Sequence, residues 1–417
     1  MAGILTKPCP TSPGEDEFVR GVPPTHLWAR RIVIICAGVL VLMLAAWVAS
    51  DPVENLSTDW MAFDNAADRV FAGEDVYRAY DAETEPLPYL YPPYALWLTL
   101  PLGAVGFAGS FIFSALLSVV CLIFGLLFMA RSQGGRVDRA TGTVVALASG
   151  SAISSVLIGQ YSGIYALAVG GSAQAWTRGR HGVAGAFLAM LWLKPNLALA
   201  VPVVLVWSRS WRALRGFAGT SALILVSSVP FGLHQWSGFF SNAKMMAELQ
   251  EDGVVPFAKM VSIVGALQTL LPVESTSPAL IIFWLASTAV LGAAVLSLWT
   301  PSALQESPTR ALGAFALFIV AANPRLYFYD ATLVSVGMLG VWLATTATAT
   351  AHGSRSVQVV SIIAIVAWIG LWGGVFVSLN IIVGPVSALG IVVTTAIQRL
   401  SGASEGQPAP ANGPSGL

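Results

Sequence analysis

Apolar runs of about 20 residues recur along this chain and restrict its fold more than any other feature. A helix of that length crosses the hydrocarbon core of a bilayer, which is about 30 Å thick. Of the 417 residues, 56% are hydrophobic and only 10% are charged, whereas soluble domains carry roughly 25% charged residues. We therefore predict an all-α polytopic membrane protein and exclude an ordinary soluble domain.

The apolar runs predict twelve transmembrane helices, at residues 32–50, 106–130, 140–158, 162–177, 182–194, 196–208, 213–232, 279–299, 309–322, 328–346, 357–374 and 378–398. They divide the chain into an N-terminal segment at 1–31, a transmembrane domain at 32–400 and a tail at 401–417. The tail is rich in Gly, Ser, Pro and Ala, a composition typical of disorder. The apolar stretch at 260–271 is too short to cross and predicts a re-entrant or interfacial segment.

The charges between the spans predict which side of the membrane each loop faces. The N-terminus and alternate loops hold 15 of the 21 Lys and Arg residues, but only six of the 21 Asp and Glu residues. Because basic loops stay in the cytoplasm, we expect both termini to be cytoplasmic and the loop at 51–93 to face outward. That loop contains Arg69, Arg78 and ten acids, which are Asp51, Glu54, Asp59, Asp64, Asp68, Glu74, Asp75, Asp81, Glu83 and Glu85.

Asp59 is the acid of this loop that we single out as a candidate catalytic residue. It precedes apolar residues at helical spacing, which predicts an amphipathic helix on the outer surface; these are Trp60, Phe63, Ala66, Ala67, Val70 and Phe71. An acid at the start of a helix also serves as a cap or first-turn charge, so a structural role is an equal alternative. The dense cluster of acids at the membrane surface favours function.

Two motifs place polar side chains near the outer membrane surface. Tyr89 and Tyr91 lie in Tyr89-Leu90-Tyr91-Pro92-Pro93-Tyr94, whose prolines exclude a regular helix. Such tyrosines either belong to an interfacial belt or stack on a sugar ring or line a lipid chain. Gln160 lies in the turn Gly159-Gln160-Tyr161-Ser162-Gly163 between two spans. It is either part of a plain turn or a hydrogen-bonding partner for a polar ligand.

A lysine interrupts the apolar pattern at Lys194-Pro195-Asn196. A lysine at membrane depth costs about 3 kcal/mol on insertion scales, so it normally has a polar partner or a ligand, unless it snorkels to the surface. The proline predicts a helix break, with two short helices meeting in the outer half of the membrane. A site built on a broken helix favours an anion contact for Lys194.

The motif Asn323-Pro324-Arg325-Leu326-Tyr327-Phe328-Tyr329-Asp330 carries opposite charges at a predicted outer helix end. Arg325 and Asp330 either pair with each other, or Arg325 binds a phosphate through its forked guanidinium. His234 begins another outer loop, and a lone loop histidine is more often incidental than catalytic. Cys9, Cys36 and Cys121 lie apart without metal-binding spacing, which supports neither a disulfide framework nor a zinc site.

Taken in order, these motifs resemble glycosyltransferase family 87, which contains bacterial polyprenol-phosphate-dependent mannosyl- and arabinofuranosyltransferases with the GT-C membrane fold. The similarity extends over residues 50–346 and rests on Thr58-Asp59, Ala67 to Tyr77 with Gly73, Tyr91-Pro92-Pro93, Leu100-Pro101-Leu102, Gly159-Gln160, Gly182 to Lys194-Pro195, and Asn323-Pro324. Some members carry a histidine near the last motif, where this chain has Tyr327, Tyr329 and Asp330. The resemblance therefore assigns no second catalytic group.

The resemblance implies a GT-C-like bundle in the bacterial inner membrane. It would transfer mannose or another hexose or pentose from a polyprenyl-phosphate donor to a lipid or glycan acceptor on the extracytoplasmic face. Asp59 would act as general base, and Lys194 and Arg325 would bind the donor phosphate. The remaining candidates for substrate contacts are Tyr89, Tyr91, Gln160, Asn196, Asn323, Tyr327 and Asp330.

The expected partners are the sugar donor, the acceptor and membrane lipids, and no nucleic acid. We expect no cofactor or metal, because polyprenyl phosphate is already an activated leaving group, although the acids could hold Mg²⁺ or Ca²⁺. A secondary transporter or a lipid flippase is the alternative, since broken helices and charges at membrane depth occur in transporters. A transferase requires Asp59, Lys194 and Arg325 to converge on one outer pocket. A transporter requires polar residues that continue to the cytoplasmic side.

Overall fold

We describe the fold from a computed structural model of the chain, which defines residues 58–78, 87–133, 147, 149–252, 257–271, 274–352, 354–374 and 379–405. The predicted span at 32–50, the N-terminal segment at 1–31 and residues 406–417 lie outside these ranges. Within them, every regular element is a helix. Met260 and Tyr327 form an isolated antiparallel bridge. The predicted all-α fold is therefore confirmed for the described residues.

The first half of the described chain contains α3 (Thr58–Ala72), η2 (Pro93–Ala95), α4 (Leu96–Gly103), α5 (Gly106–Arg131), α7 (Gly150–Leu157), α8 (Ser162–Thr177), α9 (His181–Ala189), η3 (Met190–Leu193), α10 (Pro195–Ala198), α11 (Val201–Trp207) and α12 (Trp211–Val226). The second half contains η4 (Val229–Phe231), α13 (His234–Glu251), η5 (Phe257–Lys259), α14 (Ile263–Leu270), α15 (Pro278–Leu298), α16 (Pro301–Glu306), α17 (Pro308–Ala322), η6 (Phe328–Ala331), α18 (Thr332–His352), α19 (Ser354–Gly370), η7 (Leu371–Gly374) and α20 (Asn380–Glu405).

Five helical stretches of the described ranges are long and apolar enough to cross a membrane, namely Gly106–Arg131, Trp211–Phe231, Pro278–Leu298, Phe328–Ala347 and Asn380–Leu400. Four shorter apolar stretches accompany them, at His181–Leu193, Pro195–Trp207, Pro308–Ala322 and Arg355–Gly370. Long apolar helices are what a membrane protein requires. The count of twelve crossings stays a prediction, and α20 continues to Glu405, into the segment where a disordered tail was predicted.

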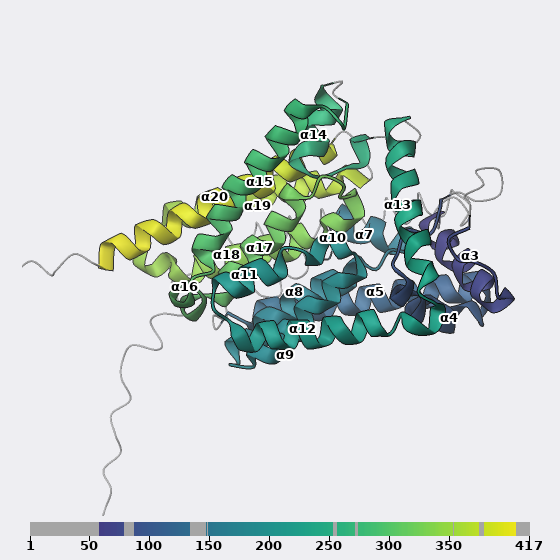
Figure 1. Cartoon of the computed structure of the whole chain (residues 1–417). Coiled ribbons are helices and arrows are strands. Elements are labelled where there is room, and N and C mark those ends of the chain that lie inside the picture. Colours follow the sequence, from purple (N-terminus) through teal and green to yellow (C-terminus); the bar gives the residue numbers. More distant parts are fainter. Residues whose placement is uncertain are drawn as a thin grey trace, which may run out of the picture.

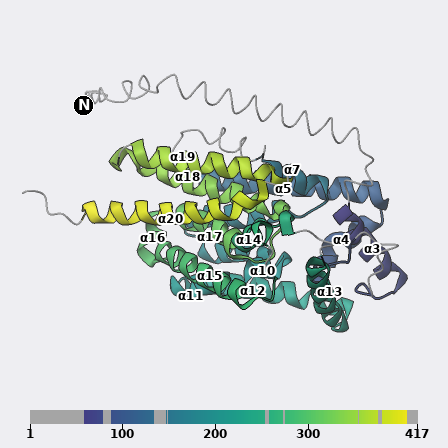
Figure 2. The ribbon, with the colours of Figure 1, turned by 90° about the horizontal axis from the view of Figure 1, so that it is seen from above.

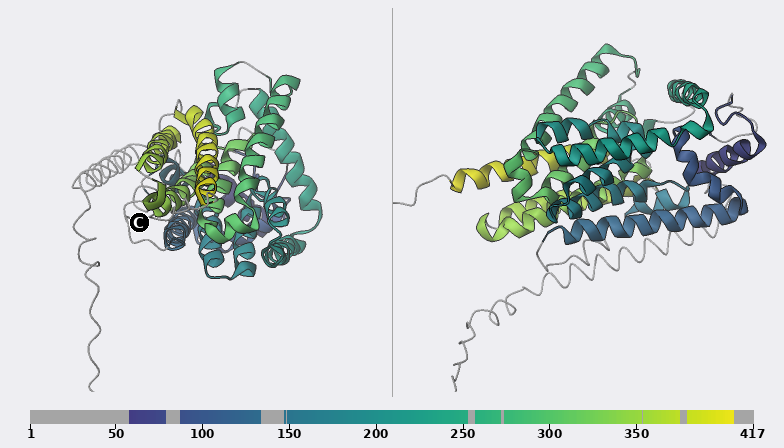
Figure 3. Two further views of the ribbon diagram at one scale, coloured as in Figure 1. Left: turned by 90° about the vertical axis from the view of Figure 1, so that its left-hand side faces the viewer. Right: turned by 60° about the horizontal axis from the view of Figure 1, so that its bottom comes forward.

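The helices form an elongated bundle whose two ends differ (Figures 1 and 2). α3, α4 and α13 gather at one end, whereas α16 and the C-terminal end of α20 lie at the other (Figure 1). The right-hand view of Figure 3 shows the same separation, with α5 extending along the bundle towards α3. The described part of the predicted outer loop, α3, and the described segments predicted to be cytoplasmic at α16 and the end of α20 therefore fall at opposite ends.

Small residues hold the centre of the bundle together, where α5 packs along α8. A Cβ atom at Gly163 would lie 1.9 Å from the carbonyl oxygen of Ser118, and one at Gly170 would lie 1.9 Å from that of Gly125. Glycine is needed at both positions because the two backbones touch. Close backbone approach through small residues is typical of helix pairs in membranes.

The predicted helix break at Lys194-Pro195 is confirmed. η3 ends at Leu193, and Lys194 has extended backbone angles, with φ −123° and ψ 103°. Pro195 then opens α10, where its missing N–H is tolerated because first-turn donors have no partner within the helix. The break turns the Lys194 side chain away from the apolar helix faces and towards the site described below.

The predicted amphipathic helix after Thr58 is α3. Trp60, Phe63, Ala66 and Ala67 are buried, whereas Phe71 at the end of the helix is 61% exposed. The stretch after His234, which was predicted as a loop, is the helix α13. The short apolar segment at 260–271 does not form a long helix, and its backbone instead pairs with the chain near Tyr327, where the Val261 N–H donates to the Leu326 carbonyl at 2.9 Å.

Candidate functional site

Asp59 is fixed at the first turn of α3 by its neighbour Trp60. The Trp60 backbone N–H donates to the Ile158 carbonyl at 3.1 Å, and its indole N–H donates to the Ser110 hydroxyl at 2.9 Å. Trp60 is buried because its ring packs against Phe63. These contacts join α3 to α5 and to the turn after α7, so they hold the Asp59 carboxyl group beside Gln160.

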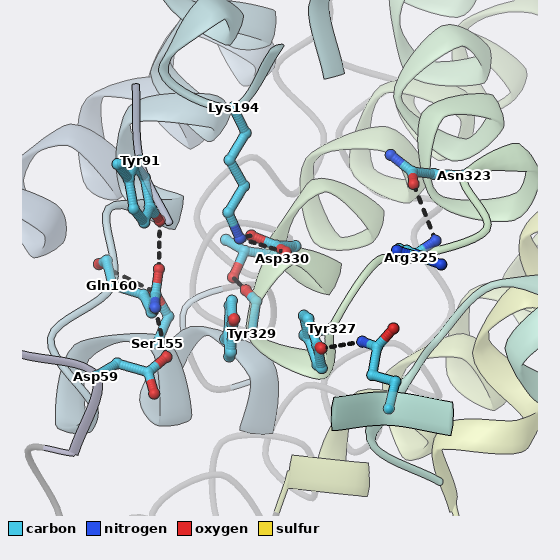
Figure 4. Close-up of polar contacts among 12 residues, drawn as sticks. Asp59, Tyr91, Ser155, Gln160, Lys194, Asn323, Arg325, Tyr327, Tyr329 and Asp330 are labelled. Atoms are coloured by element: carbon cyan, nitrogen blue, oxygen red, sulfur yellow. Dashed lines mark hydrogen bonds and ion pairs between the residues drawn. The ribbon is translucent and has the colours of Figure 1, made fainter. Parts of the chain in front are cut away.

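Gln160 connects Asp59 to Tyr91 (Figure 4). Its side-chain amide nitrogen donates to Oδ2 of Asp59, and its amide oxygen accepts a hydrogen bond from the Tyr91 hydroxyl at 2.5 Å. Gln160 and Tyr91 are 4% and 5% exposed. Three residues from α3, the loop before η2 and the turn before α8 thus form one polar chain, which is buried at Gln160 and Tyr91 and half-buried at Asp59.

A second polar group, the ion pair of Lys194 and Asp330, lies beside Tyr91 and Gln160 (Figure 4). Lys194 Nζ donates to both carboxylate oxygens of Asp330, at 2.8 and 2.7 Å. The same ammonium lies 4.6 Å from the centre of the Tyr329 ring and 5.7 Å from that of Tyr91, distances typical of cation–π contacts. The Asp330 side chain is 1% exposed and that of Lys194 17%, so the pair is largely shielded from solvent.

Asp330 does not pair with Arg325, and this alternative from the sequence is wrong. Lys194 occupies the carboxylate of Asp330, while Figure 4 shows Arg325 set apart beside Asn323. The Arg325 backbone N–H donates to the Asn323 side-chain oxygen at 3.1 Å, and the Arg325 side chain is exposed. Lys194 is the partner of Asp330 because the helix break directs its side chain towards this carboxylate. Arg325 instead lies beside Asn323, to which its backbone N–H donates.

Aromatic rings lie beside the ion pair of Lys194 and Asp330 (Figure 4). The rings of Tyr327 and Tyr329 stack with centres 5.6 Å apart and planes inclined by 18°. The side chain of Gln250, at the end of α13, donates to the Tyr327 hydroxyl. Tyr89 is buried, and its carbonyl accepts a hydrogen bond from Asn242 at 3.2 Å. The site therefore includes contacts with α13.

Burial raises the pKa of Asp59 above its ordinary value of 3.8, because a carboxylate removed from water loses hydration. The hydrogen bond from Gln160 and the positive charges of Lys194 and Lys259 act in the opposite direction. Asp59 is thus a carboxyl group whose proton is held more strongly than in water. Such a shift is common in functional sites.

The structure brings together Asp59, Tyr91, Gln160, Lys194 and Asp330 among the residues predicted from the sequence. Asn196 is exposed on α10, two positions beyond Lys194. Sequence reasoning missed Gln250, Lys259 and the ring of Tyr329. The aromatic run at 327–329 was a signal for Tyr329, but nothing in the local sequence distinguishes Gln250 or Lys259. The roles assigned to the predicted residues stay predictions.

Within the described ranges, no group of three or more His, Cys, Asp or Glu side chains is placed to hold a metal ion. Several acids of the outer loop lie outside these ranges, namely Asp51, Glu54, Asp81, Glu83 and Glu85. The expectation of a metal-free reaction therefore also stays a prediction.

Comparison with known proteins gives one family. The sequence model of glycosyltransferase family 87 matches residues 89–324, more than half of the chain. No curated protein matches the chain. The matched range includes Tyr91, Gln160 and Lys194, but it begins after Asp59 and ends before Asp330. The family match therefore does not extend to the two acids of the site.

Proposed function

The chain belongs to glycosyltransferase family 87 and is a membrane glycosyltransferase, and we propose that it transfers a sugar from a polyprenyl-phosphate donor with Asp59 as general base. This membership favours the transferase over the transporter or flippase that the sequence also allowed. One observation carries the proposal. Two half-buried charged groups from separate parts of the chain meet at Tyr91, because Asp59 is linked to its hydroxyl through Gln160 and the Lys194 ammonium lies 5.7 Å from the centre of its ring.

The proposed reaction uses the carboxylate form of Asp59. An acceptor hydroxyl attacks the anomeric carbon of the donor sugar while the bond from that carbon to the phosphate oxygen breaks. The hydroxyl proton passes to Asp59, and the bonding electron pair leaves with the polyprenyl phosphate. General-base catalysis of this kind contributes roughly 10²- to 10⁴-fold in rate.

Positive charge would stabilise the departing phosphate. Lys194 and Arg325 are the cations we propose for this contact. Lys194 already neutralises Asp330, so its ammonium is held in place before the donor arrives, and Arg325 is exposed. The polyprenyl chain would lie against apolar helix faces such as those of α12 and α15, where Leu223 is 73% and Ile282 is 66% exposed. The charge pattern of the loops supports a reaction on the extracytoplasmic side.

The test is sugar transfer in proteoliposomes, with a panel of polyprenyl-phosphate sugars and candidate lipid or glycan acceptors. We expect activity with one donor, and loss of at least about a hundredfold in Asp59→Asn. Asp68→Asn is the matched control, because it makes the same change at an exposed position of the same helix and should retain activity. Equal activity of Asp59→Asn and wild type would remove Asp59 from the chemistry. Transfer from nucleotide sugars alone would overturn the polyprenyl donor.

A further inference from the structure

We propose that Gln160 and Tyr91 are positioning residues, which present Oδ1 of Asp59 to the acceptor hydroxyl and keep Oδ2 occupied. This inference rests on the proposed role of Asp59 as base. It follows from the directions of two hydrogen bonds of the Gln160 amide, one with Asp59 and one with Tyr91. The direction of one determines the direction of the other, because both involve the same amide group.

The orientation of the Gln160 amide follows from the charge of Asp59. A carboxylate accepts hydrogen bonds and donates none, so it requires the NH₂ group of Gln160, and this group lies at Oδ2. The Gln160 amide oxygen must then face Tyr91, whose hydroxyl donates to it. Burial raises the pKa of Tyr91 well above 10, which keeps this donor protonated. In the opposite orientation, two acceptors would face each other unless Asp59 carried a proton.

The turn that carries Gln160 is itself held rigidly. The Gln160 backbone N–H donates to the Ser155 carbonyl at 2.8 Å, and its own carbonyl accepts from the Ser118 hydroxyl at 3.1 Å. Gly159 before it has a φ of 80°, a conformation that favours glycine, and a Cβ there would lie 2.6 Å from Cβ of Trp60. The amide thus approaches Asp59 from a fixed direction, as a preorganised catalytic group requires.

Tyr91 also links the base to the cation of the site. Its hydroxyl bonds Gln160, while its ring lies 5.7 Å from Lys194 Nζ. Among the described hydrogen bonds, Gln160 is the donor to the Asp59 carboxylate, which leaves Oδ1 as the oxygen available to substrate. The arrangement assigns separate tasks to the two oxygens of one carboxylate.

Two readouts test the inference in Gln160→Leu, Gln160→Glu and Tyr91→Phe. The first is the titration of the Asp59 carboxyl group, measured as the infrared difference between each protein and the same protein carrying Asp59→Asn. The second is the pH profile of kcat/KM for sugar transfer. Because a hydrogen bond to the carboxylate favours the charged form, Gln160→Leu should move the titration and the acid limb of the profile to higher pH.

The loss of kcat/KM on the acid side should be about tenfold in Gln160→Leu. It should be larger in Gln160→Glu, where a second acid replaces the donor, and smaller in Tyr91→Phe, which leaves the amide in place. Ser155→Ala is the control, because its hydroxyl contacts the Gln160 carbonyl at 3.3 Å without touching Asp59. It should leave the Asp59 titration where it is.

An unchanged Asp59 titration in both Gln160→Leu and Tyr91→Phe would overturn the inference, and so would an equal loss of kcat/KM at every pH. Both results would mean that Gln160 only holds α3 against the bundle. The infrared titration needs no substrate. If the wild type transfers no sugar, the proposed function fails on that result, while the shift of the carboxyl titration still decides whether Gln160 and Tyr91 control Asp59.

Discussion

The centre of the bundle and the candidate site are built by different means. Along α5 and α8, two regular helices touch through their backbones at Gly163 and Gly170. In the candidate site, the functional side chains come from a first helical turn, a loop, an inter-helix turn and a helix break, and hydrogen bonds of their side chains connect them. The contrast shows how regular helices supply a frame, while interrupted helices bring charged groups together.

The largest effect should come from removing one partner of the ion pair of Lys194 and Asp330. This change tests whether the site contributes to stability as well as to activity. Lys194→Ala would leave the Asp330 carboxylate buried without a counter-charge, which typically destabilises by about 3–5 kcal/mol. We expect this loss in the unfolding free energy measured by denaturant titration in mixed micelles, together with loss of sugar transfer. A lower unfolding free energy would show that the site also stabilises the helical bundle.

Two controls accompany that experiment. Lys244→Ala removes the exposed partner of Glu248 and should leave the unfolding free energy unchanged within error. Replacing both Lys194 and Asp330 by apolar residues should recover most of the stability, but no activity. A double variant as unstable as Lys194→Ala would contradict the assignment of the loss to an unpaired charge.

A substitution between α5 and α8 should lower the stability of the protein but not its activity. Gly170→Ala would place a methyl group 1.9 Å from the Gly125 carbonyl oxygen, and such overpacking costs about 1–3 kcal/mol. The unfolding free energy should fall, whereas the folded fraction should retain most of its transfer rate. Gly219→Ala on α12 is the matched control, because a Cβ there meets no atom within 4 Å and alanine favours a helix.

Deprotonation of Asp59 should have opposite effects on stability and on activity. Its pKa lies above 3.8 in the folded protein because the carboxyl group is buried. Its contribution to stability is therefore complete below about 3.8 and is lost as pH rises through the raised value. Activity should increase over the same interval, because the base must be deprotonated. Wild type and Asp59→Asn should thus diverge in stability as pH rises, and parallel stability curves would contradict this.

The smallest expected effect is that of metal removal. Sugar transfer should be unaffected by EDTA, since the proposed leaving group is already activated and the site supplies its own cations. The measurement is the transfer rate before and after chelation in sealed proteoliposomes. Loss of activity that Mg²⁺ restores would show that acids of the outer loop hold a metal.

The sequence predicts the parts of this site that follow local rules. The helix after Thr58 follows from apolar spacing, and the break at Lys194 follows from the chemistry of Pro195. The partner of Lys194 could not be predicted, because Asp330 lies 136 residues away and a nearer charge, Arg325, offered Asp330 an equally reasonable pairing. α13 was missed because its mixture of polar and apolar residues resembles a loop, and its contact through Gln250 depends on the folded chain.

The separation of Lys194 and Asp330 along the chain has a consequence for biosynthesis. Ribosomes add about 5–20 residues per second, so the 136 residues between the two take roughly 7 to 27 s to make. During that interval the nascent chain holds a lysine whose insertion costs about 3 kcal/mol, and its carboxylate has not yet been translated. The membrane insertion machinery must therefore shelter an incomplete charge pair until Asp330 leaves the ribosome.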